Sequence, residues 1–406
     1  MKDGYKHLGE YIRQVDIRNT DGKEENLLGV SVQKQFIPSI ANTVGTDFTK
    51  YKVVKKGQFT YIPDTSRRGD KIGIALLKDY EEGLVSNVYT VFEVVDTEKL
   101  LPEYLMLWFS RPEFDRYARF KSHGSVREVF DWNEMCMVEL PVPAIEEQRK
   151  IVKAYKAITD RIALKKQIND NLEAQAQAIF TSWFVKYEPF EHSIDEDGSP
   201  LPPTDWENGI LDSCIDFING YAFKSDELLS EPLPDCYDVF KMGNIKKGGG
   251  LNYDGTRSWI ERKSCSGLER FVLSQGDILM AMTDMKENVA LLGHTALMDI
   301  ADKYIVNQRV GLLRSNGYLG ISPYQIYLLT NNPIFLRELR RHAHIGVQVN
   351  LSKEDIINSR VIFAPEEINR AFTHKIKPLF DYISLNNAEI LKLNDAALQI
   401  QTQLSR

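Results

Sequence analysis

The second half of this 406-residue sequence repeats the first half with a shift of 221 residues. When residues 102–179 are aligned without a gap on residues 323–400, seventeen of the 78 positions are identical, whereas ordinary compositions give roughly five by chance. A solenoid unit, at about 20–50 residues, is far shorter. We therefore interpret the chain as a duplicated half-protein, which predicts approximate two-fold symmetry and a target with two parts. The identical pairs include Pro102/Pro323, Pro112/Pro333, Phe114/Phe335, His123/His344, Glu146/Glu367, Arg149/Arg370, Asp160/Asp381, Leu164/Leu385, Leu172/Leu393 and Ile179/Ile400.

Each copy ends in a long stretch whose apolar residues follow alternating spacings of four and three. That spacing is the heptad pattern of a coiled coil. Both stretches follow a proline and begin with acidic residues, which favour the positive end of a helix dipole. The predicted seam residues are Ile151, Ile158, Ile162, Leu172 and Ile179 in the first copy, and Leu379, Ile383, Asn386, Leu393 and Ile400 in the second.

A seam of this kind has to be buried against another surface. The first stretch leads away from the first globular region and the second leads back, so we predict that the two helices pair in antiparallel orientation. Core packing under each globular region and dimerisation with a second chain are the alternatives. Lys165 and Asn386 hold equivalent mid-seam positions, where polar residues commonly fix the register. Pro378 stands at the position of Ala157 and predicts a kink in the second helix, or its effective start.

The residues before each long stretch are rich in β-branched and aromatic segments, which predicts strands over 51–61, 88–95, 270–280 and 310–313. Short helices are predicted to begin at Pro102 and Pro323, and again at Pro112 and Pro333, because proline suits a first helical turn. The predicted fold is α+β, with two strand-rich globular domains joined by two long helices that form an antiparallel coiled coil. The predicted boundaries are 1–143 for the first globular domain, 144–186 for the central helical region, 187–205 for an exposed acidic, proline-rich linker, 206–365 for the second globular domain and 366–406 for the C-terminal helical region.

The composition, 43% hydrophobic and 26% charged, is that of a globular protein. No apolar run approaches the roughly 18 residues of a membrane span, and the first residues do not begin a signal peptide, so we expect a cytoplasmic protein. The cysteines at 136, 214, 236 and 265 are widely spaced, which favours free thiols over a zinc site. A net charge of -7 argues mildly against a nucleic-acid partner, so local charge has to decide.

Four sequence strings occur in an order typical of one family: "PVPAIEEQRKI" at 141–151, "AIFTSWFVKYEPF" at 178–190, "LPPTDW" at 201–206 and "FINGYAFKS" at 217–225. With the duplication and the paired heptads, they make the chain resemble the specificity subunit of type I restriction-modification systems over essentially its whole length. The second copy departs from the pattern, with "PEEINRAF" where the first has "EEQRKI".

The resemblance implies two target recognition domains, each reading one half of an asymmetric bipartite site in double-stranded DNA. The helices would set the spacer between the half-sites and would dock two methylation subunits that methylate adenine. In the restriction complex, motor and nuclease subunits would join. S-adenosylmethionine, ATP and Mg would bind to these partner subunits, and no cofactor or metal is expected on this chain.

Missing or misleading catalytic motifs also predict a non-catalytic chain. A G-x-x-x-x-G-K-[ST] phosphate loop is absent from the sequence. The segment 332–335 looks like the N-P-P-[YF] motif of adenine methyltransferases, but its counterpart 111–114 reads Arg-Pro-Glu-Phe. The shared feature is therefore a helix begun by proline with a buried phenylalanine. Pro63 and Asp64 begin like a nuclease signature, but no acid-x-lysine follows at a useful spacing.

DNA reading needs cations for phosphates and side chains with paired donors and acceptors for base edges. Loops of both copies carry such residues, most densely after Ser66 and around Asn244. The equivalent residues His123 and His344 have no obvious acidic partner at a repeated spacing, so we predict a structural or phosphate-contacting role for them. The predicted DNA-binding residues are Gln33, Lys34, Gln35, Arg67, Arg68, Lys71 and Arg127 in the first copy, and Asn244, Lys246, Lys247, Arg257, Lys286, Asn288, Gln308, Arg309, His344 and Gln348 in the second.

Two alternative functions stay open on the sequence alone. One is a specificity subunit of another bipartite modification system that has no nuclease. The other, from a different class, is a coiled-coil adaptor that presents two protein-binding modules. The target sequence and the spacer length cannot be read from these residues.

Overall fold

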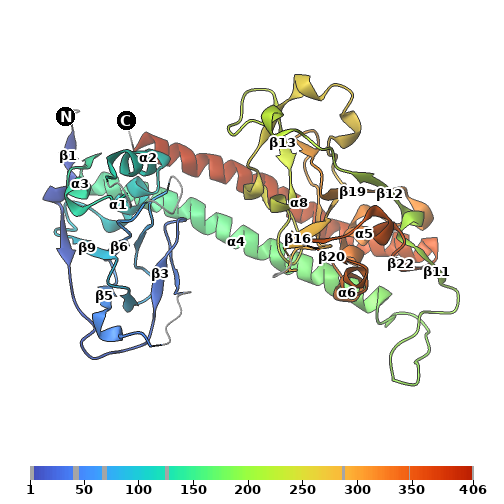
Figure 1. The fold of residues 1–406 in the computed structure, drawn as a ribbon. Helices are drawn as coiled ribbons and strands as arrows, with labels where there is room; N and C mark the ends of the chain where they lie inside the picture. The colour runs from blue at the N-terminus through green and yellow to red at the C-terminus, as the bar shows by residue number, and fades with distance from the viewer. Residues whose placement is uncertain are drawn as a thin grey trace. The chain divides into compact units, whose positions relative to one another are not determined.

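The computed structural model describes residues 4–39, 45–65, 71–123, 128–285, 289–346 and 348–404. The chain forms two compact units, which are described separately. The first unit comprises Met1–Lys165 with Glu389–Arg406, and the second comprises Lys166–Ala388. The long helices α4 (Ile145–Phe184) and α8 (Glu366–Gln403) each contribute to both units (Figure 1).

The first unit is built on a four-stranded antiparallel sheet with α-helices packed against it. The sheet order is β2 (Ile12–Val15), β9 (Thr90–Val94), β6 (Phe59–Tyr61) and β7 (Ile74–Leu76). Its buried face carries an aromatic core, in which the rings of Phe59 and Phe92 stack with centroids 4.9 Å apart. The helices are α1 (Pro102–Phe109), α2 (Pro112–Lys121) and α3 (Trp132–Cys136). Three strand pairs complete the unit: β1 (Tyr5–His7) with β10 (Glu139–Pro141), β3 (Leu28–Val30) with β4 (Phe36–Pro38), and β5 (Lys52–Lys55) with β8 (Glu82–Val85).

The second unit repeats this plan. Its four-stranded sheet has the order β12 (Ile215–Asn219), β19 (Val310–Ser315), β15 (Ile278–Ala281) and β17 (Thr295–Leu297). Its helices are α5 (Pro323–Thr330), α6 (Pro333–Arg341) and α7 (Lys353–Ile357). The remaining strands are β11 (Glu207–Ile210) paired with β22 (Arg360–Phe363), the sheet β14 (Trp259–Glu261), β13 (Cys236–Phe240) and β18 (Tyr304–Val306), and the small sheet β16 (Thr283–Met285), β21 (Gln348–Asn350) and β20 (His344–Ile345).

The structural repeat reaches further upstream than the sequence identities. Helices α5 and α7 and strand β17 lie 221 residues after α1, α3 and β7, end to end. The prolines predicted to begin the four short helices stand at the first helical position of α1, α2, α5 and α6, which confirms those predictions. Beside the main sheet, β18 lies within one residue of the position that the 221-residue shift gives for β8. The β3–β4 hairpin, in contrast, has no strand pair at the shifted positions 249–251 and 257–259.

The predicted antiparallel pairing of α4 and α8 is confirmed within each unit. In the first unit, Gln401 donates to the hydroxyl of Tyr155 at 3.1 Å and Lys165 pairs with Glu389 at 2.7 Å. In the second unit, the rings of Phe180 and Phe372 have centroids 6.0 Å apart. As residue numbers increase along α4, the residue numbers of the partners on α8 decrease, which is the pattern of antiparallel helices. All ten predicted seam residues are buried or half-buried.

Some local predictions were wrong. Helix α8 begins at Glu366 and continues through Pro378, so Pro378 is not its start, while the kink predicted as the other outcome stays a prediction. Pro378 and His374 are exposed, so the carbonyl that lacks its usual donor can be hydrated. Residues 51–61 form two strands, because the chain turns at Gly57 with φ +84°. Residues 270–280 are strand only from Ile278, after a 3-10 turn at Glu269–Phe271.

Other expectations can be compared directly with the described residues. The segment 187–205 is mostly exposed, and Tyr187 and Trp206 at its ends pack together. The four cysteines are unpaired. Within the described ranges, no cluster of three or more potential ligands could hold a metal ion. The described helices also lack a segment of the length and apolarity needed to cross a membrane.

Candidate DNA interface

The most basic loop of the second unit connects β13 to β14 and is called the basic loop here, residues 241–257. Lys246, Lys247 and Arg257 are exposed on it, as a phosphate-binding role requires. Asn244, in contrast, is fully buried. Its side chain accepts from the backbone of Lys241 at 2.9 Å and donates to Thr256 Oγ1 at 3.0 Å. Asn244 therefore shapes the loop, and its side chain does not reach solvent where it could meet a base.

Three consecutive glycines give the basic loop its tight turn. Gly248, Gly249 and Gly250 have φ values of +88°, +98° and +97°, a region that side chains rarely adopt. A Cβ on Gly249 would lie 2.6 Å from Oδ1 of Asn331. The glycines therefore allow the two lysines to be presented at the tip of a loop that packs closely on α5.

Two further predicted residues of the second unit lie in the turn that precedes β19. Gln308 and Arg309 are exposed there, and Arg309 has φ +70°. The backbone of this turn is held by hydrogen bonds from Gln308 N to Tyr221 O at 2.8 Å and from Met282 N to Arg309 O at 3.0 Å. The two side chains are thus carried by a fixed backbone and are free to meet a ligand.

The two equivalent histidines each face an acidic side chain, which corrects the expectation that they have none. His344 begins β20, and its Nε2 lies 3.3 Å from Oδ2 of Asp355. His123 Nε2 lies 3.8 Å from Oε1 of Glu134. Each acid follows its histidine by eleven residues, so the pairs are equivalent under the 221-residue shift. A comparison by chemical class, in place of identity, could have found them.

The charge of Asp355 is favoured by its surroundings. Burial would raise the pKa of its carboxyl, but hydrogen bonds from the hydroxyl and the backbone N–H of Ser352, with His344 and His342 nearby, hold that pKa below its usual value. His344 and His123 are 72% and 71% exposed. Both side chains are therefore accessible to a phosphate. The predicted residue Gln348, on the paired strand β21, is half-buried.

In the first unit, the predicted residues 33–35 form the turn of the β3–β4 hairpin. Gln33 and Gln35 are exposed. Lys34 turns inward with φ +62°, donates to Phe109 O at 2.5 Å and pairs with Asp115 at 2.8 Å. Burial lowers the pKa of Lys34, although Asp115 opposes that shift. Lys34 therefore ties the hairpin to the helices and is not presented to DNA in this structure.

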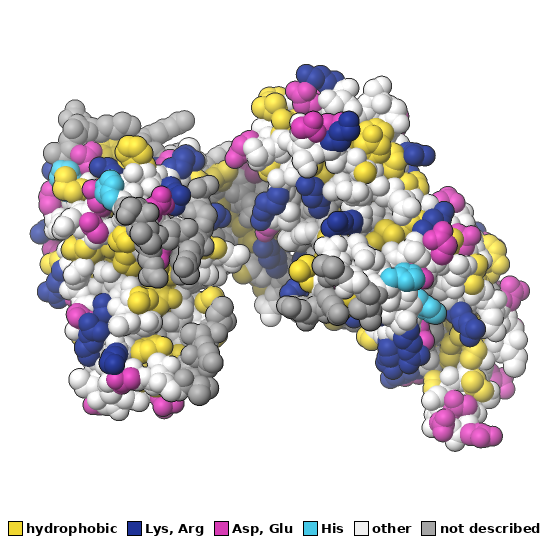
Figure 2. Space-filling view, in the orientation of Figure 1, with side chains coloured by type: hydrophobic (Ala, Val, Ile, Leu, Met, Phe, Trp, Pro, Cys, Tyr) yellow, Lys and Arg dark blue, Asp and Glu magenta, His cyan; other side chains and the backbone are white. Residues whose placement is uncertain are grey.

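Of the six remaining predicted residues, the structure describes one. Lys71 is exposed before β7. Figure 2 shows acidic and basic side chains interspersed on the face drawn, without a large surface of one sign in either unit. The predicted contacts therefore stay individual predictions. Arg67, Arg68, Arg127, Lys286 and Asn288 lie outside the described residues.

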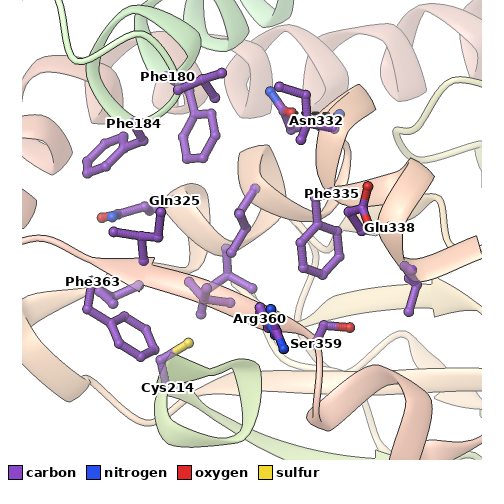
Figure 3. Close-up of a pocket in the computed structure, with 18 of the residues that line it drawn as sticks. Phe180, Phe184, Cys214, Gln325, Asn332, Phe335, Glu338, Ser359, Arg360 and Phe363 are labelled. Atoms are coloured by element: carbon purple, nitrogen blue, oxygen red, sulfur yellow. Dashed lines mark hydrogen bonds between the residues drawn. The ribbon is translucent and has the colours of Figure 1, made fainter. Parts of the chain in front are cut away.

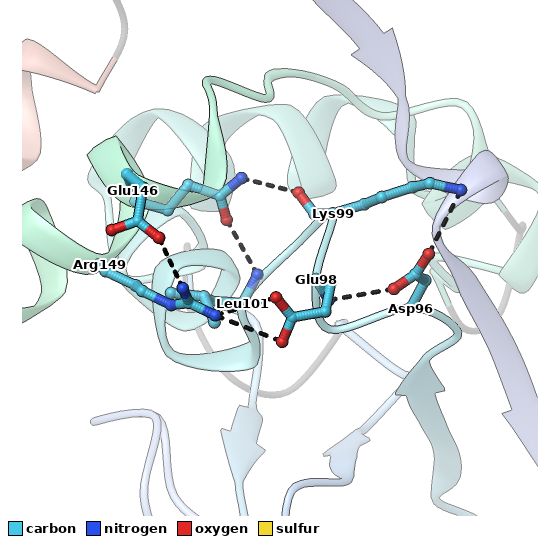
Figure 4. Close-up of polar contacts among 7 residues, drawn as sticks. Asp96, Glu98, Lys99, Leu101, Glu146 and Arg149 are labelled. Carbon is cyan, nitrogen blue, oxygen red and sulfur yellow. Dashed lines mark hydrogen bonds and ion pairs between the residues drawn. The ribbon is translucent and has the colours of Figure 1, made fainter.

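A polar joint missed by the sequence reasoning holds each long helix to its globular part. In the first unit, Gln148 of α4 is fully buried, accepts from Leu101 N at 2.9 Å and donates to the carbonyls of Lys99 and Pro143 at 2.8 Å each. Beside it, Arg149 pairs with Glu98 at 3.0 Å (Figure 4). In the second unit, the equivalent Asn369 is also fully buried and bonds to the carbonyls of Leu319 and Ala364 and to Gln325.

The second unit also contains a cavity of about 650 Å³ between α4, α6 and β22. Four phenylalanine rings, of Phe180, Phe184, Phe335 and Phe363, line it among aliphatic and polar side chains (Figure 3). The thiol of Cys214 also lines it, but burial raises the pKa of that thiol to about 12. The thiolate nucleophile that catalysis would need is therefore disfavoured at neutral pH.

Comparison with known proteins shows what this chain is similar to. Residues 10–174 match the family described as Type I restriction modification DNA specificity domain. The type I restriction enzyme MjaIX specificity subunit of Methanocaldococcus jannaschii is 22% identical over 328 residues, 75% of this chain and 69% of that protein. The HindI specificity subunit of Haemophilus influenzae is 27% identical over 255 residues, 60% of this chain and about half (52%) of that protein.

A solved structure shares the fold. The S subunit of a type I restriction-modification system from M. genitalium covers 98% of this chain and 95% of its own, with a TM-score of 0.52 and 12% identity. The family match covers residues 10–174, and the relatives are type I restriction enzyme specificity subunits. Residues 10–174 belong to the type I restriction modification DNA specificity domains, and the resemblance of the chain to type I specificity subunits is confirmed.

Proposed function

We propose that this protein is the DNA-reading subunit of a type I restriction-modification complex, in which each unit reads one half of a bipartite site. The observation that carries the proposal is the structural repeat. Two units share one sheet order and one set of helices, and each includes part of the same antiparallel helix pair. Two similar readers joined in this way suit a target made of two half-sites.

The two half-sites should differ in sequence. The shared elements are the main sheet, the short helices and the joints at Gln148 and Asn369, all of which are scaffold. The segments that differ include the β3–β4 hairpin in the first unit and the basic loop in the second. Base readout depends on the side chains of such segments, so different segments give an asymmetric target.

The helix pair would hold the two readers at a set spacing and dock two methylation subunits. Those subunits would bind S-adenosylmethionine, flip an adenine out of the duplex in each half-site and transfer the methyl group. Motor and nuclease subunits would add ATP and Mg in the restriction complex. This chain would supply recognition alone, without catalysis or a cofactor of its own.

The net charge of -7 fits a complex in which this chain and the methylation subunits together bind DNA. Non-specific affinity rests on neutralised phosphates, and the methylation subunits would supply much of it. We therefore expect the isolated chain to bind its target poorly and the complex to bind tightly. Tight and specific binding by the pure chain, measured by titration of labelled duplex at physiological salt, would contradict this part of the proposal.

The decisive experiment is methylome sequencing of a host that carries the chain with its methylation subunits. A bipartite motif with methylated adenine should be present, and it should vanish when the gene for this chain is deleted. An adaptor with two protein-binding modules would leave the methylome unchanged on deletion. Co-purification with methylation subunits, and no motor subunit, would instead favour a modification system without a nuclease.

A further inference from the structure

A continuous chain of hydrogen bonds joins the basic loop to the seam of the helix pair. Tyr253, in the basic loop, donates its hydroxyl to Asp299. Asn387 of α8 donates to the same carboxylate oxygen at 2.8 Å. Asn387 in turn accepts from Asn169 of α4 at 2.8 Å, and Asn169 accepts from Asn386 at 2.8 Å. All five residues belong to the second unit.

Burial gives this chain of bonds its stiffness. Asn169 and Asn386 are 8% and 2% exposed. Burial, followed by the adjacent Asp299, raises the pKa of Tyr253, which keeps its hydroxyl protonated and donating. A buried polar group that loses its partner costs about 1–3 kcal/mol, so alternative positions of the loop that break these bonds are disfavoured.

A second contact fixes the same loop one helical turn further along α4. Glu173 accepts from the hydroxyl of Tyr327 at 3.1 Å, and the charge of Lys246 acts on its carboxyl. A Cβ on Gly250 would lie within 3.7 Å of both Glu173 Oε2 and the Tyr327 hydroxyl. The glycine turn of the basic loop is thus seated against α4 and α5.

The first unit has different residues at the equivalent positions. Asn386 and Asn387 correspond to Lys165 and Lys166, and Asn169 corresponds to Ile390. The helix contact there is an ion pair, in which Glu389 meets Arg161 at 2.5 Å and Lys165 at 2.7 Å. The amide network is therefore a feature of the second unit, where it reaches a predicted DNA-binding loop.

We propose that Tyr253 and Asn387 are positioning residues for DNA reading by the second unit. They hold the basic loop at one place on the helix pair, so that Lys246, Lys247 and Arg257 meet the DNA in one register. This inference rests on the proposed function, since the loop is a reading element only if the second unit binds DNA.

The test uses the full chain expressed with its methylation subunits in a host free of other adenine methylation. The variants are Tyr253→Phe, which removes one hydroxyl, and Asn387→Ala. Methylome sequencing then compares occupancy of the cognate motif with sites that carry one substituted base in either half. The loss of one such hydrogen bond costs about 1 kcal/mol, which changes an equilibrium constant roughly fivefold. We expect discrimination to fall about threefold to tenfold at one half-site, with the other unchanged.

Matched controls separate positioning from general loss of stability. Tyr382→Phe and Asn394→Ala change exposed residues of α8 and should leave both half-sites as in the unaltered protein. Unchanged discrimination in both test variants, or an equal loss at both half-sites, would overturn the inference while the proposed function stands. A parent protein that yields no bipartite motif would overturn the proposed function itself. If Asn387→Ala does not fold, Tyr253→Phe decides alone.

Discussion

Asn386 donates a hydrogen bond to Asn169 at 2.8 Å across the seam between α8 and α4. Lys165 holds the equivalent position in the first copy of the repeat. There it forms an ion pair with Glu389 in the first unit. Each half of the helix pair therefore has its own polar contact. Because an amide pair is satisfied only when both partners meet, it favours one register of the two helices over shifted ones.

Breaking the amide pair should destabilise the second unit. Asn386→Ala removes the donor to the buried side-chain oxygen of Asn169, at a cost of about 1–3 kcal/mol. For a unit of this size we expect the midpoint of thermal unfolding to fall by about 3–8 °C. The double variant Asn169→Leu with Asn386→Leu should recover only part of the loss, because it removes both partners of this bond but also removes the donor to Asn387 Oδ1. Asn171→Ala, exposed on α4 within the second unit, is the control. An unshifted midpoint in Asn386→Ala would refute the register role.

The joint at Gln148 should be more sensitive than its surroundings. Gln148→Ala removes three hydrogen bonds to Lys99, Leu101 and Pro143, so we expect a loss of about 2–3 kcal/mol in the free energy of unfolding of the first unit. Urea denaturation followed by tryptophan fluorescence measures it. Lys153→Ala, exposed on the part of α4 that belongs to the first unit, should change that free energy by less than about 0.5 kcal/mol. Equal effects of the two substitutions would mean that the joint contributes no more to the free energy of unfolding than an exposed residue does.

The parts of the fold that could be predicted from sequence are those with local signals. Pro102 and Pro323 begin helices because their ring suits the first turn, and the seam follows from the heptad spacing of Ile158 or Ile383. The strand over 51–61 was wrong because the pattern does not show where a glycine adopts positive φ. Gly57 divides it.

The site residues were harder to predict because exposure is a tertiary property. Lys34 and Asn244 have the side chains of DNA-binding residues and stand in loops. The structure buries both, since Lys34 meets Asp115 of α2 and Asn244 meets Thr256 at the far end of the same loop. Their partners lie 81 and 12 residues away in the sequence, and no periodicity links them.

The buried carboxyl of Glu173 gives the second unit a pH dependence. Burial raises its pKa, while Lys246 and the hydroxyl of Tyr327 oppose the shift. A carboxyl with a raised pKa in the folded state stabilises that state at low pH, and its contribution is lost as pH rises through the folded pKa. Glu173→Gln should therefore unfold at a higher temperature than the parent protein at pH 7. The gain should shrink as pH falls towards the unfolded value near 4.5.

The control for this pH effect is Glu196→Gln, in the exposed linker. Its midpoint of thermal unfolding should follow that of the parent protein at every pH between 5 and 8, within the roughly ±0.5 kcal/mol of a surface substitution. If Glu173→Gln were less stable than the parent at pH 7, the attraction of Lys246 for the carboxylate would outweigh the cost of burial. The sign of the difference therefore decides between the two causes.

The helix pair offers a direct test of how the spacer is set. Within the first unit, residue numbers of partners on α4 and α8 sum to nearly the same value, as for Tyr155 with Gln401 and Lys165 with Glu389. Removing 158–164 together with 390–396 therefore deletes one heptad from each helix and keeps the pairing. Seven residues span about 10 Å of helix, or roughly three base pairs at 3.4 Å each. We expect methylome sequencing to show both half-sites unchanged and a spacer shorter by about that number. Deletion of 158–164 alone shortens one helix only, so the two helices no longer match, and it should abolish methylation. An unchanged spacer in the paired deletion would show that the helices do not determine the spacer length.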